Sequence, residues 1–467
     1  MEEIDQTQGL CSRCLQVLPA KIFKTGSRIV LEKVCPVHGK EQTLISSDAL
    51  WYERIMRYPA VLSSPASAQS PSAKGCPLDC GYCPAHDQRV YLPVVPITSA
   101  CNLDCPVCYT INKNRNSYFM SRDEFATILG QIRANDPEMQ IINFTGGEPL
   151  IHPHFCELVE MCREDGIHRI TISTNGMRFL EDPELLPRLT DLDTRIVLSF
   201  NSFNPGPYQV TAGRDLLEKK IRILSLLEKY KPSTTLLTVV AAGINDHEIG
   251  DIVRFVLESD FIVSSEIHTV TFTGQSMGRF DASTRLTVPD VLDRIIEKNP
   301  FVSKQAFLPS PCAHPMCYST CYFLKLENGR VVPFTDFLAE KDMLRALTGH
   351  LYMEPTLNTE EVLKEAVNVL WSSSEQTEKG EQILMTLRAL LNDMFGSRRM
   401  DFSARQQRAE KTLKAVYVHS HMDAANFDIA RVRQCCVAVP DGQGGHIPTC
   451  SYNTIYRAKD PRFCEEV

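Results

Sequence analysis

The feature that most constrains this chain is a short stretch with three cysteines, Cys101-Asn-Leu-Asp-Cys105-Pro-Val-Cys108. Its spacing places three thiols in one tight loop. A cubic 4Fe-4S cluster with full protein ligation takes four cysteines, so a loop of three leaves one iron open for another ligand. A strand-like run from Tyr91 to Thr98 directly precedes the loop, which predicts that the cysteines lie at the carboxyl end of a strand.

The 18 cysteines of this 467-residue chain occur mostly in tight groups, which suits metal ligation in a reducing compartment better than disulfide bonding. The first residues, Met1 to Asp5, are acidic and do not resemble an export signal. A net charge of −8 argues against nucleic-acid binding, and no apolar run approaches the roughly 18 residues that span a bilayer. We therefore expect a cytoplasmic protein for which any membrane association would be a peripheral contact.

The first cysteine group combines Cys11-Ser-Arg-Cys14 with Cys35-Pro-Val-His38. Two knuckles about 20 residues apart predict a small ribbon with one tetrahedral metal, either Zn or rubredoxin-like Fe. The histidine in the fourth place favours Zn. Strand-like segments from Ala20 to Phe23 and from Ser27 to Val34 lie between the knuckles. Free thiols are the alternative interpretation.

The second group, Cys76-Pro-Leu-Asp-Cys80-Gly-Tyr-Cys83, repeats the spacing of the loop at Cys101. It follows residues 63–74, which are rich in Ser, Ala and Pro and indicate a linker. Two such triplets predict two clusters, of which only one need take part in radical chemistry. A further zinc knuckle is the alternative for this group.

From Tyr91 onward, short apolar strands alternate with amphipathic helices. Six strands with helices between them predict a parallel sheet that curls into a partial (β/α)6 TIM-type barrel, an α/β fold. The expected strands are Val94 to Thr98, Gln140 to Phe144, His168 to Ser173, Thr194 to Phe200, Thr234 to Ala241 and Glu266 to Thr273. The expected helices are Ser121 to Ala134, Pro153 to Asp165, Arg214 to Tyr230 and Asn245 to Glu258.

Two of these helices carry specific signals. Ser121 and Glu124 form a capping-box pattern at the start of the first helix. In the helix from Arg214 to Tyr230, we expect Leu217, Ile221 and Leu224 to be buried.

Sites in such barrels form where the strands end. Thr145-Gly146-Gly147-Glu148-Pro149 follows the second expected strand, and Ser199 and Asn201 end the fourth. A pair of glycines exposes backbone groups to a close ligand, and Glu148 adds a carboxylate beside them. This combination predicts a site for an ammonium group.

Together, the cysteine loop and the Gly-Gly-Glu-Pro segment one β/α unit later resemble the radical S-adenosylmethionine (SAM) superfamily. The resemblance covers about residues 90 to 300. It implies that Cys101, Cys105 and Cys108 hold a 4Fe-4S cluster whose open iron is chelated by SAM. It also implies SAM contacts from Gly146, Gly147, Glu148, Ser199 and Asn201, although the fourth strand ends in Ser-Phe-Asn-Ser rather than the frequent Ser-Leu-Asp-Gly.

The last third of the chain carries six more grouped thiols, in Cys312, Cys317 and Cys321 and in Cys435, Cys436 and Cys450. They suggest another 4Fe-4S cluster. We favour Cys312, Cys317 and Cys321 with a fourth ligand from the second set, Cys435 and Cys450 being metal candidates there. The alternative is a separate centre in the last region. The helical stripes near Thr359 to Trp371 and Glu381 to Met394 indicate ordinary packing.

The full cysteine layout, which ends in Cys435-Cys436 and Pro448-Thr-Cys450-Ser-Tyr-Asn, resembles the archaeal tetraether lipid synthase family and its bacterial relatives. That family has also been labelled dihydropterin methyltransferase-like. The resemblance implies one or two auxiliary 4Fe-4S clusters, a mononuclear metal and carbon–carbon bond formation between lipid alkyl chains. We divide the chain into a metal ribbon (1–62), an auxiliary cluster segment (63–90), the barrel (91–300) and a C-terminal cluster domain (301–467).

Three functions are compatible with the sequence. The first is a radical SAM enzyme that abstracts hydrogen from a long-chain lipid, which requires an apolar tunnel. The second is a radical SAM methyltransferase or tailoring enzyme on a pterin or other small substrate, which requires a compact polar pocket. The third is a non-enzymatic electron carrier, which leaves Gly-Gly-Glu-Pro unexplained. Both enzymes need an electron donor such as flavodoxin or ferredoxin. The sequence assigns no side chain a direct catalytic role.

Overall fold

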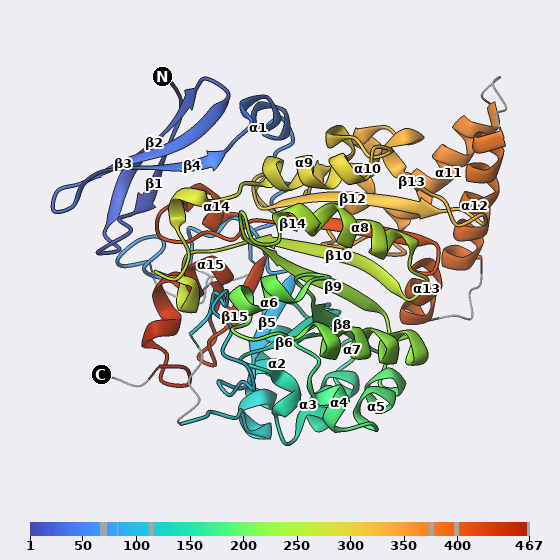
Figure 1. Cartoon of the computed structure of the whole chain (residues 1–467), viewed down its shortest axis with the longest axis horizontal. Helices are drawn as coiled ribbons and strands as arrows, with labels where there is room; N and C mark the ends of the chain where they lie inside the picture. The colour runs from blue at the N-terminus through green and yellow to red at the C-terminus, as the bar shows by residue number, and fades with distance from the viewer. Residues whose placement is uncertain (66–71, 82, 112–115, 373–377, 397–400, 465–467) are drawn as a thin grey trace.

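The computed structural model describes residues 1–65, 72–81, 83–111, 116–372, 378–396 and 401–464. Residues 66–71 of the expected linker lie outside this described part. An antiparallel sheet at the N-terminus follows the order β1 (Glu2–Leu10), β2 (Val17–Thr25), β3 (Arg28–Cys35) and β4 (Gly39–Ser46). Helix α1 (Ala49–Ile55) follows it, and Figure 1 shows this ribbon at one end of the molecule, beside the barrel.

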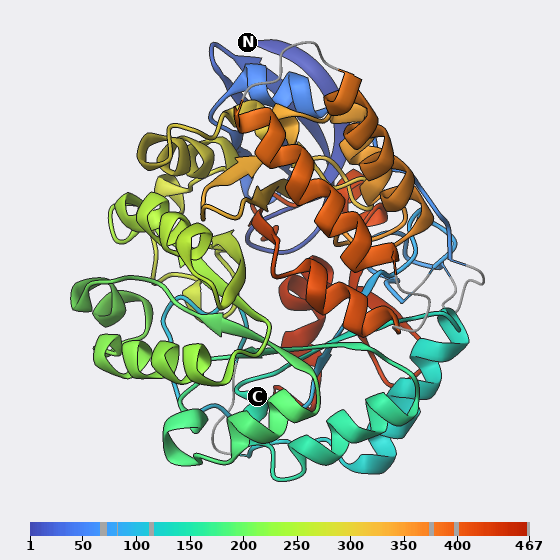
Figure 2. The ribbon, with the colours of Figure 1, turned by 90° about the vertical axis from the view of Figure 1, so that its right-hand side faces the viewer.

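The central sheet confirms the predicted partial barrel. Strands β5 to β10 are neighbours in chain order, and each pairs in parallel with the next. Helices cover the outer face of the sheet, as Figure 2 shows. The strands are β5 (Leu92–Pro96), β6 (Ile141–Thr145), β7 (Arg169–Thr174), β8 (Thr194–Ser199), β9 (Thr234–Val240) and β10 (Ile262–Thr269). The connecting helices include α2 (Arg122–Asn135), α3 (Phe155–Glu164), α4 (Arg178–Glu181), α5 (Leu185–Asp191), α6 (Pro205–Thr211), α7 (Leu217–Tyr230) and α8 (Ile249–Glu258).

The capping box at the start of α2 is confirmed. The Ser121 hydroxyl accepts from the Glu124 N–H at 3.2 Å, and the Glu124 carboxylate accepts from the Ser121 N–H at 2.7 Å. The sixth strand, in contrast, begins earlier than expected, at Ile262 instead of Glu266. It also ends earlier than expected, at Thr269 instead of Thr273, opposite Val240, the last residue of its neighbour β9.

The expected buried face of α7 is wrong at Ile221, which is 43% exposed. The buried residues of this helix are Lys220, Ile223, Leu224 and Leu227. Because Lys220 finds polar partners at the carboxyl edge of the sheet, the helix turns this cation inward and Ile221 outward. The expectation that only apolar residues of this helix are buried is therefore wrong, because Lys220 is buried as well.

The cysteine-rich C-terminal part extends the barrel sheet at both edges. Strand β14 (Leu413–His419) pairs in parallel with β10, and β12 (Tyr318–Lys325) pairs antiparallel with β14. At the opposite edge, β15 (Val437–Pro440) pairs in parallel with β5, and β16 (His446–Pro448) follows it. Segments far apart in the sequence thereby surround one barrel interior.

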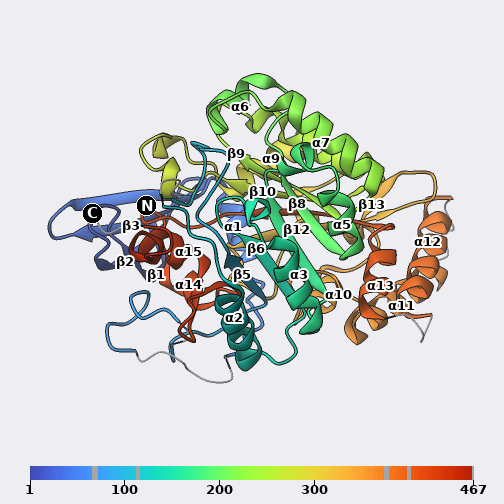
Figure 3. The same cartoon turned by 90° about the horizontal axis from the view of Figure 1, so that it is seen from below.

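Three C-terminal helices, α11 (Leu357–Ser372), α12 (Glu378–Phe395) and α13 (Phe402–Ala409), lie away from the ribbon, as Figure 3 shows. Ile383, Leu387, Leu390 and Met394 are buried in a second apolar core, so this stripe is ordinary packing as expected. Within the described residues, every helix is too short or too polar to span a bilayer.

Candidate active site

A cavity of about 280 Å³ lies at the carboxyl ends of the barrel strands and continues into the barrel interior. Cys101, Cys105 and Cys108 all line it. Burial, together with the nearby Glu148 carboxylate and the other two thiols, raises the pKa of Cys101 to about 12. Burial and Cys108 raise the pKa of Cys105 to about 12. Three thiols in one loop suit a 4Fe-4S cluster with an open iron.

The two glycines after β6 permit a very close approach between two loops. A Cβ atom on Gly147 would lie 2.0 Å from the carbonyl oxygen of Ala100, and one on Gly146 would lie 2.3 Å from that of Thr98. Gly146 also has a φ of +145°. The N–H of Gly147 donates to the Thr98 carbonyl at 2.8 Å. Gly146 and Gly147 therefore allow the loop after β6 to lie directly against the cysteine loop, so that both loops can contact one ligand.

Glu148 connects neighbouring strand ends. Its carboxylate accepts from the Thr174 hydroxyl at 2.6 Å, from the Asn175 N–H at 2.7 Å and from the Leu150 N–H at 3.1 Å. Burial raises the pKa of this carboxyl, against these hydrogen bonds. The carboxylate thus joins the ends of β6 and β7 while it lines the cavity. Its predicted contact with an ammonium group remains a prediction.

Lys220 is a site residue that sequence reasoning missed. Its buried ammonium donates to the Asn175 carbonyl at 2.7 Å and to the carbonyl and hydroxyl oxygens of Ser199 at 2.5 and 3.1 Å. Burial lowers its pKa to about 8, while the negative charges of Cys105 and Glu148 act in the opposite direction. A cation here balances the anionic groups at the rim and fixes the ends of β7 and β8.

The expected fourth-strand residues also line the cavity. The Asn201 amide is engaged within the protein, because its oxygen accepts from the Val239 N–H at 3.0 Å and its nitrogen donates to the Thr211 hydroxyl at 3.3 Å. Ser199 is held by Lys220. Both residues therefore have fixed positions at the rim, and their contacts with SAM remain predictions.

The cavity wall below the rim is rich in hydrogen-bonding side chains. The Asn143 amide oxygen accepts from the hydroxyls of Thr171 and Ser173 at 2.9 and 3.2 Å. On the opposite wall, the Thr235 and Ser264 hydroxyls lie 2.8 Å apart. Val197 and Leu237 line the wall as well. Hydrogen-bonding and apolar side chains therefore both line the interior, which suits a compact ligand with polar and apolar parts.

The amino ends of the strands are closed by a buried charge cluster. Glu410 forms ion pairs with Arg195 and, at 3.5 Å, with Arg169, and it accepts from the Ser233 hydroxyl at 2.9 Å. The two guanidinium groups keep the pKa of Glu410 low despite its burial. The cluster seals the end of the barrel opposite the cysteine loop.

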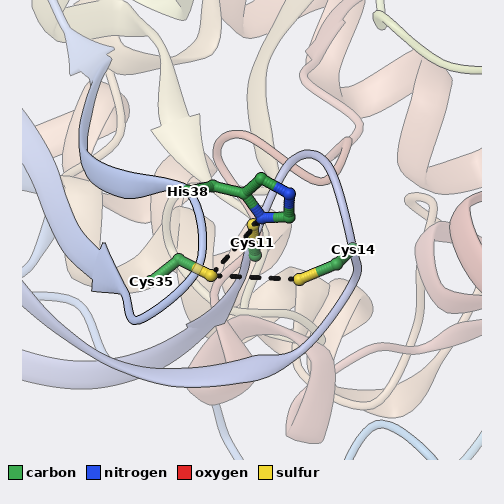
Figure 4. A group of neighbouring side chains, drawn as sticks. All are labelled: Cys11, Cys14, Cys35 and His38. Carbon is green, nitrogen blue, oxygen red and sulfur yellow. Dashed lines mark hydrogen bonds between the residues drawn. The ribbon is translucent and has the colours of Figure 1, made fainter.

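The N-terminal ribbon brings together the four predicted ligands, as Figure 4 shows. Cys11 Sγ and Cys35 Sγ lie 3.3 and 3.5 Å from His38 Nδ1, and the sulfurs of Cys14 and Cys35 are 3.9 Å apart. Burial opposes ionisation of Cys11, but backbone N–H groups of Cys14 and Arg13 lower its pKa to about 6. A tetrahedral Zn site is the arrangement that these donors suit.

The triplet at Cys76 packs against the end of the chain. Hydrogen bonding with Cys76 and burial raise the pKa of Cys80, and Cys83 is buried. The Tyr456 hydroxyl donates to the Pro77 carbonyl at 2.9 Å and accepts from the Cys80 N–H at 3.0 Å. Whether the three thiols hold a cluster remains a prediction.

The C-terminal thiols do not all meet. Four thiols, those of Cys317, Cys435, Cys436 and Cys450, line a small buried cavity together with Arg431, whose guanidinium lies 3.7 Å from Cys317 Sγ. Cys312 instead donates to the His350 carbonyl at 3.1 Å. Cys321 lies in β12, three residues after Tyr318, and strand alternation turns it away from the interior that Tyr318 lines. The structure thus gathers a different set of thiols from the one favoured above.

Other site residues that the sequence did not reveal are His268, Glu266, His419 and His421. Glu266 and His268 lie in β10, His419 ends β14, and His421 follows two residues later; no strand is predicted at β14 from the sequence. The signal that could have found β14 is the alternation in Ala415-Val-Tyr-Val-His419, in which Tyr417 and His419 face the cavity.

Comparisons with known families agree with this architecture. Residues 95–256 match the model of the radical SAM superfamily, and residues 3–47 match that of the HMPTM N-terminal zinc ribbon domain. The chain therefore contains a radical SAM domain and an N-terminal zinc ribbon domain.

Among similar proteins, the 7,8-dihydro-6-hydroxymethylpterin dimethyltransferase of Methanocaldococcus jannaschii is 27% identical over 97% of this chain and 94% of that protein. A probable GTP 3′,8-cyclase of Methanothermobacter marburgensis is 32% identical over 34% of this chain and 52% of that protein. The crystal structure of Streptococcus suis SuiB bound to precursor peptide SuiA aligns with a TM-score of 0.39 and 19% identity, over 46% of each chain. The zinc ribbon match and the similarity over 97% of the chain agree better with the small-substrate interpretation than with lipid coupling.

Proposed function

We propose that this radical SAM enzyme methylates a reduced pterin or a closely related bicyclic heterocycle. The observation that carries the proposal is the similarity to a pterin dimethyltransferase over 97% of the chain. Hydrogen-bonding side chains in the interior agree with it. Asn143, Thr171 and Ser173 place amide and hydroxyl groups beside the apolar residues of the interior, and a heterocycle can hydrogen-bond to such groups whereas two alkyl chains cannot.

In this proposal Cys101, Cys105 and Cys108 hold the cluster, and the rim of Gly147, Glu148 and Ser199 holds SAM. When bound, the cluster and SAM together supply a carbon-centred radical that can abstract hydrogen from an unactivated C–H bond. The protein orients the pterin on the polar wall below the rim and excludes water. One-electron reduction requires an external donor, for which flavodoxin or ferredoxin is our candidate.

We also propose that Cys317, Cys435 and Cys450 hold an auxiliary 4Fe-4S cluster. Arg431 supports this assignment, because the negative charges of Cys317 and Cys450 raise its already high pKa despite burial. The Arg431 guanidinium favours the thiolate form of Cys450, against the burial that raises the pKa of this thiol to about 11.

The test is an anaerobic incubation of the full chain with dithionite, SAM carrying a deuterated methyl group, and 7,8-dihydro-6-hydroxymethylpterin. We expect pterin-dependent 5′-deoxyadenosine and methionine from the SAM that supplies the radical. We also expect S-adenosylhomocysteine from a second SAM, which donates its methyl group to give a pterin product heavier by one or more deuterated methyl groups. Cys105→Ala should abolish both the 5′-deoxyadenosine and the methylated pterin, whereas Cys156→Ala, at a half-buried cysteine on α3, should retain them. Cleavage of SAM that responds to long-chain lipid and not to the pterin would favour the lipid interpretation.

A further inference from the structure

Three histidines meet where β10 and β14 end. His268 lies opposite His419 in the parallel register of the two strands, and His421 follows two residues later on the same side of the extended chain. One ring nitrogen from each histidine lies within 4.8 Å of the others. All three rings line the main cavity, on the wall next to the cysteine loop.

We propose that His268, His419 and His421 bind a single divalent transition-metal ion, with Zn²⁺ as the reference case. Three imidazoles are an established ligand set that leaves one coordination position open. Ligands about 2.0–2.1 Å from a tetrahedral ion stand roughly 3.3 Å apart, so small ring rotations close the observed spacing. The open position faces the cavity and would accept an oxygen or nitrogen donor from a bound substrate.

The surroundings of the three rings are those of a built metal site. The Glu266 carboxylate oxygen lies 2.8 Å from His268 Nε2, which leaves Nδ1 of that ring for a metal. Carboxylates commonly orient metal-binding histidines in this way. Tyr318 stacks on His419 with ring centroids 3.9 Å apart and an interplanar angle of 17°. Tyr109, the residue after Cys108, stacks on His421 at 5.1 Å.

One competing assignment comes from a neighbouring thiol. Cys450 Sγ lies 3.8 Å from His421 Nδ1, so His421 could instead complete the proposed auxiliary cluster. Two observations favour the histidine site. His268 is oriented by a carboxylate and points to the same place, and His419 and His421 have ring centroids only 4.1 Å apart. The site does not depend on the identity of the substrate.

The test measures metal content in the full chain, purified anaerobically and dialysed against buffered Zn²⁺. We expect two zinc ions per chain in addition to cluster iron. Cys14→Ser should remove the ribbon ion, and the double variant His268→Gln/His419→Gln should remove the other. His446→Gln, at another buried histidine, is the matched control and should keep both ions. Thermal melting of each variant checks that it folds.

A second measurement leaves the three histidines intact. Zinc X-ray absorption of the Cys14→Ser variant should show nitrogen or oxygen ligands at about 2.0–2.1 Å and no sulfur at about 2.3 Å. The proposal is overturned if wild type holds a single zinc ion that Cys14→Ser removes, or if the ion left in that variant has sulfur ligands. Loss of iron and sulfide, and not of zinc, in His421→Gln would assign that ring to the auxiliary cluster.

Discussion

The side-chain amide of Asn175 donates a 2.7 Å hydrogen bond to Asn102 Oδ1, within the cysteine loop. The backbone N–H of Asn175 donates to Glu148, and its carbonyl accepts from Lys220. One residue at the end of β7 therefore connects the cluster loop, the Gly-Gly-Glu-Pro segment and α7. The rim of the site behaves as one hydrogen-bonded unit and not as separate motifs.

Replacing Asn175 with Ala should weaken this unit without removing a cluster ligand. Loss of one hydrogen bond costs about 1 kcal/mol, so we expect SAM cleavage to slow roughly fivefold with iron content unchanged. The measurement is the initial rate of 5′-deoxyadenosine formation, normalised to cluster iron. Asn328→Ala, at an exposed asparagine, is the control. An unchanged rate in Asn175→Ala would show that the cysteine loop is fixed by other contacts.

Substitution of Gly147 with Ala tests the close approach of the two loops. The new Cβ would lie 2.0 Å from the Ala100 carbonyl oxygen, a backbone atom that cannot move aside cheaply. We expect a loss of about 3 kcal/mol in the free energy of unfolding and poor cluster retention.

The matched control for this substitution is Gly130→Ala. Gly130 lies inside α2, where an added Cβ meets open space. This variant should gain about 0.5–1 kcal/mol of stability, because alanine favours the helix. Denaturant midpoints and iron content, measured anaerobically, check both variants. Equal effects at the two positions would contradict the geometric argument.

Stability should decrease in mild acid partly because of His446. Burial lowers the pKa of this histidine to about 4, whereas the unfolded chain carries it at about 6.5. As the pH falls from 6.5 towards 4, the unfolded state takes up a proton that the folded state refuses. Unfolding is therefore favoured, by up to about 1.4 kcal/mol per pH unit. His446→Gln should flatten this slope by the same amount in denaturation series between pH 7 and pH 5. A slope as steep as that of wild type would show that His446 is protonated in the folded chain.

The sequence was sufficient for features that depend on local spacing. The partial barrel, the ribbon ligands and the capping box at Ser121 all follow from periodicity or from residues a few positions apart. Features that depend on strand order were not accessible. Cys317, beside β12, lines one cavity with Cys435, Cys436 and Cys450, although β12 and β15 lie at opposite edges of the sheet, whereas local spacing favoured Cys312 and Cys321. Lys220 was missed because a buried cation depends on partners that only the folded rim supplies.

Glu410 gives a test of the closed end of the barrel. Glu410→Gln would leave the buried guanidinium groups of Arg195 and Arg169 without their anionic partner. Breaking a buried pair in this way costs about 3–5 kcal/mol, so we expect a large fall in the denaturant midpoint. The charged groups around Glu410 lie at the amino ends of the strands, whereas the cysteine loop lies at their carboxyl ends. SAM cleavage per folded molecule should therefore change little.

The control for Glu410 is the exposed ion pair between Arg188 and Glu160, whose atoms are 2.9 Å apart. Glu160→Gln should change the free energy of unfolding by less than about 0.5 kcal/mol, because exposed pairs are well solvated. If Glu410→Gln were as mild as Glu160→Gln, the guanidinium groups would have to be neutralised by another group in the interior. A strong fall in SAM cleavage per folded molecule in Glu410→Gln would instead show that the closed end of the barrel is coupled to the rim of the site. Substitution of Asn143, in the interior between them, would then test the path of that coupling.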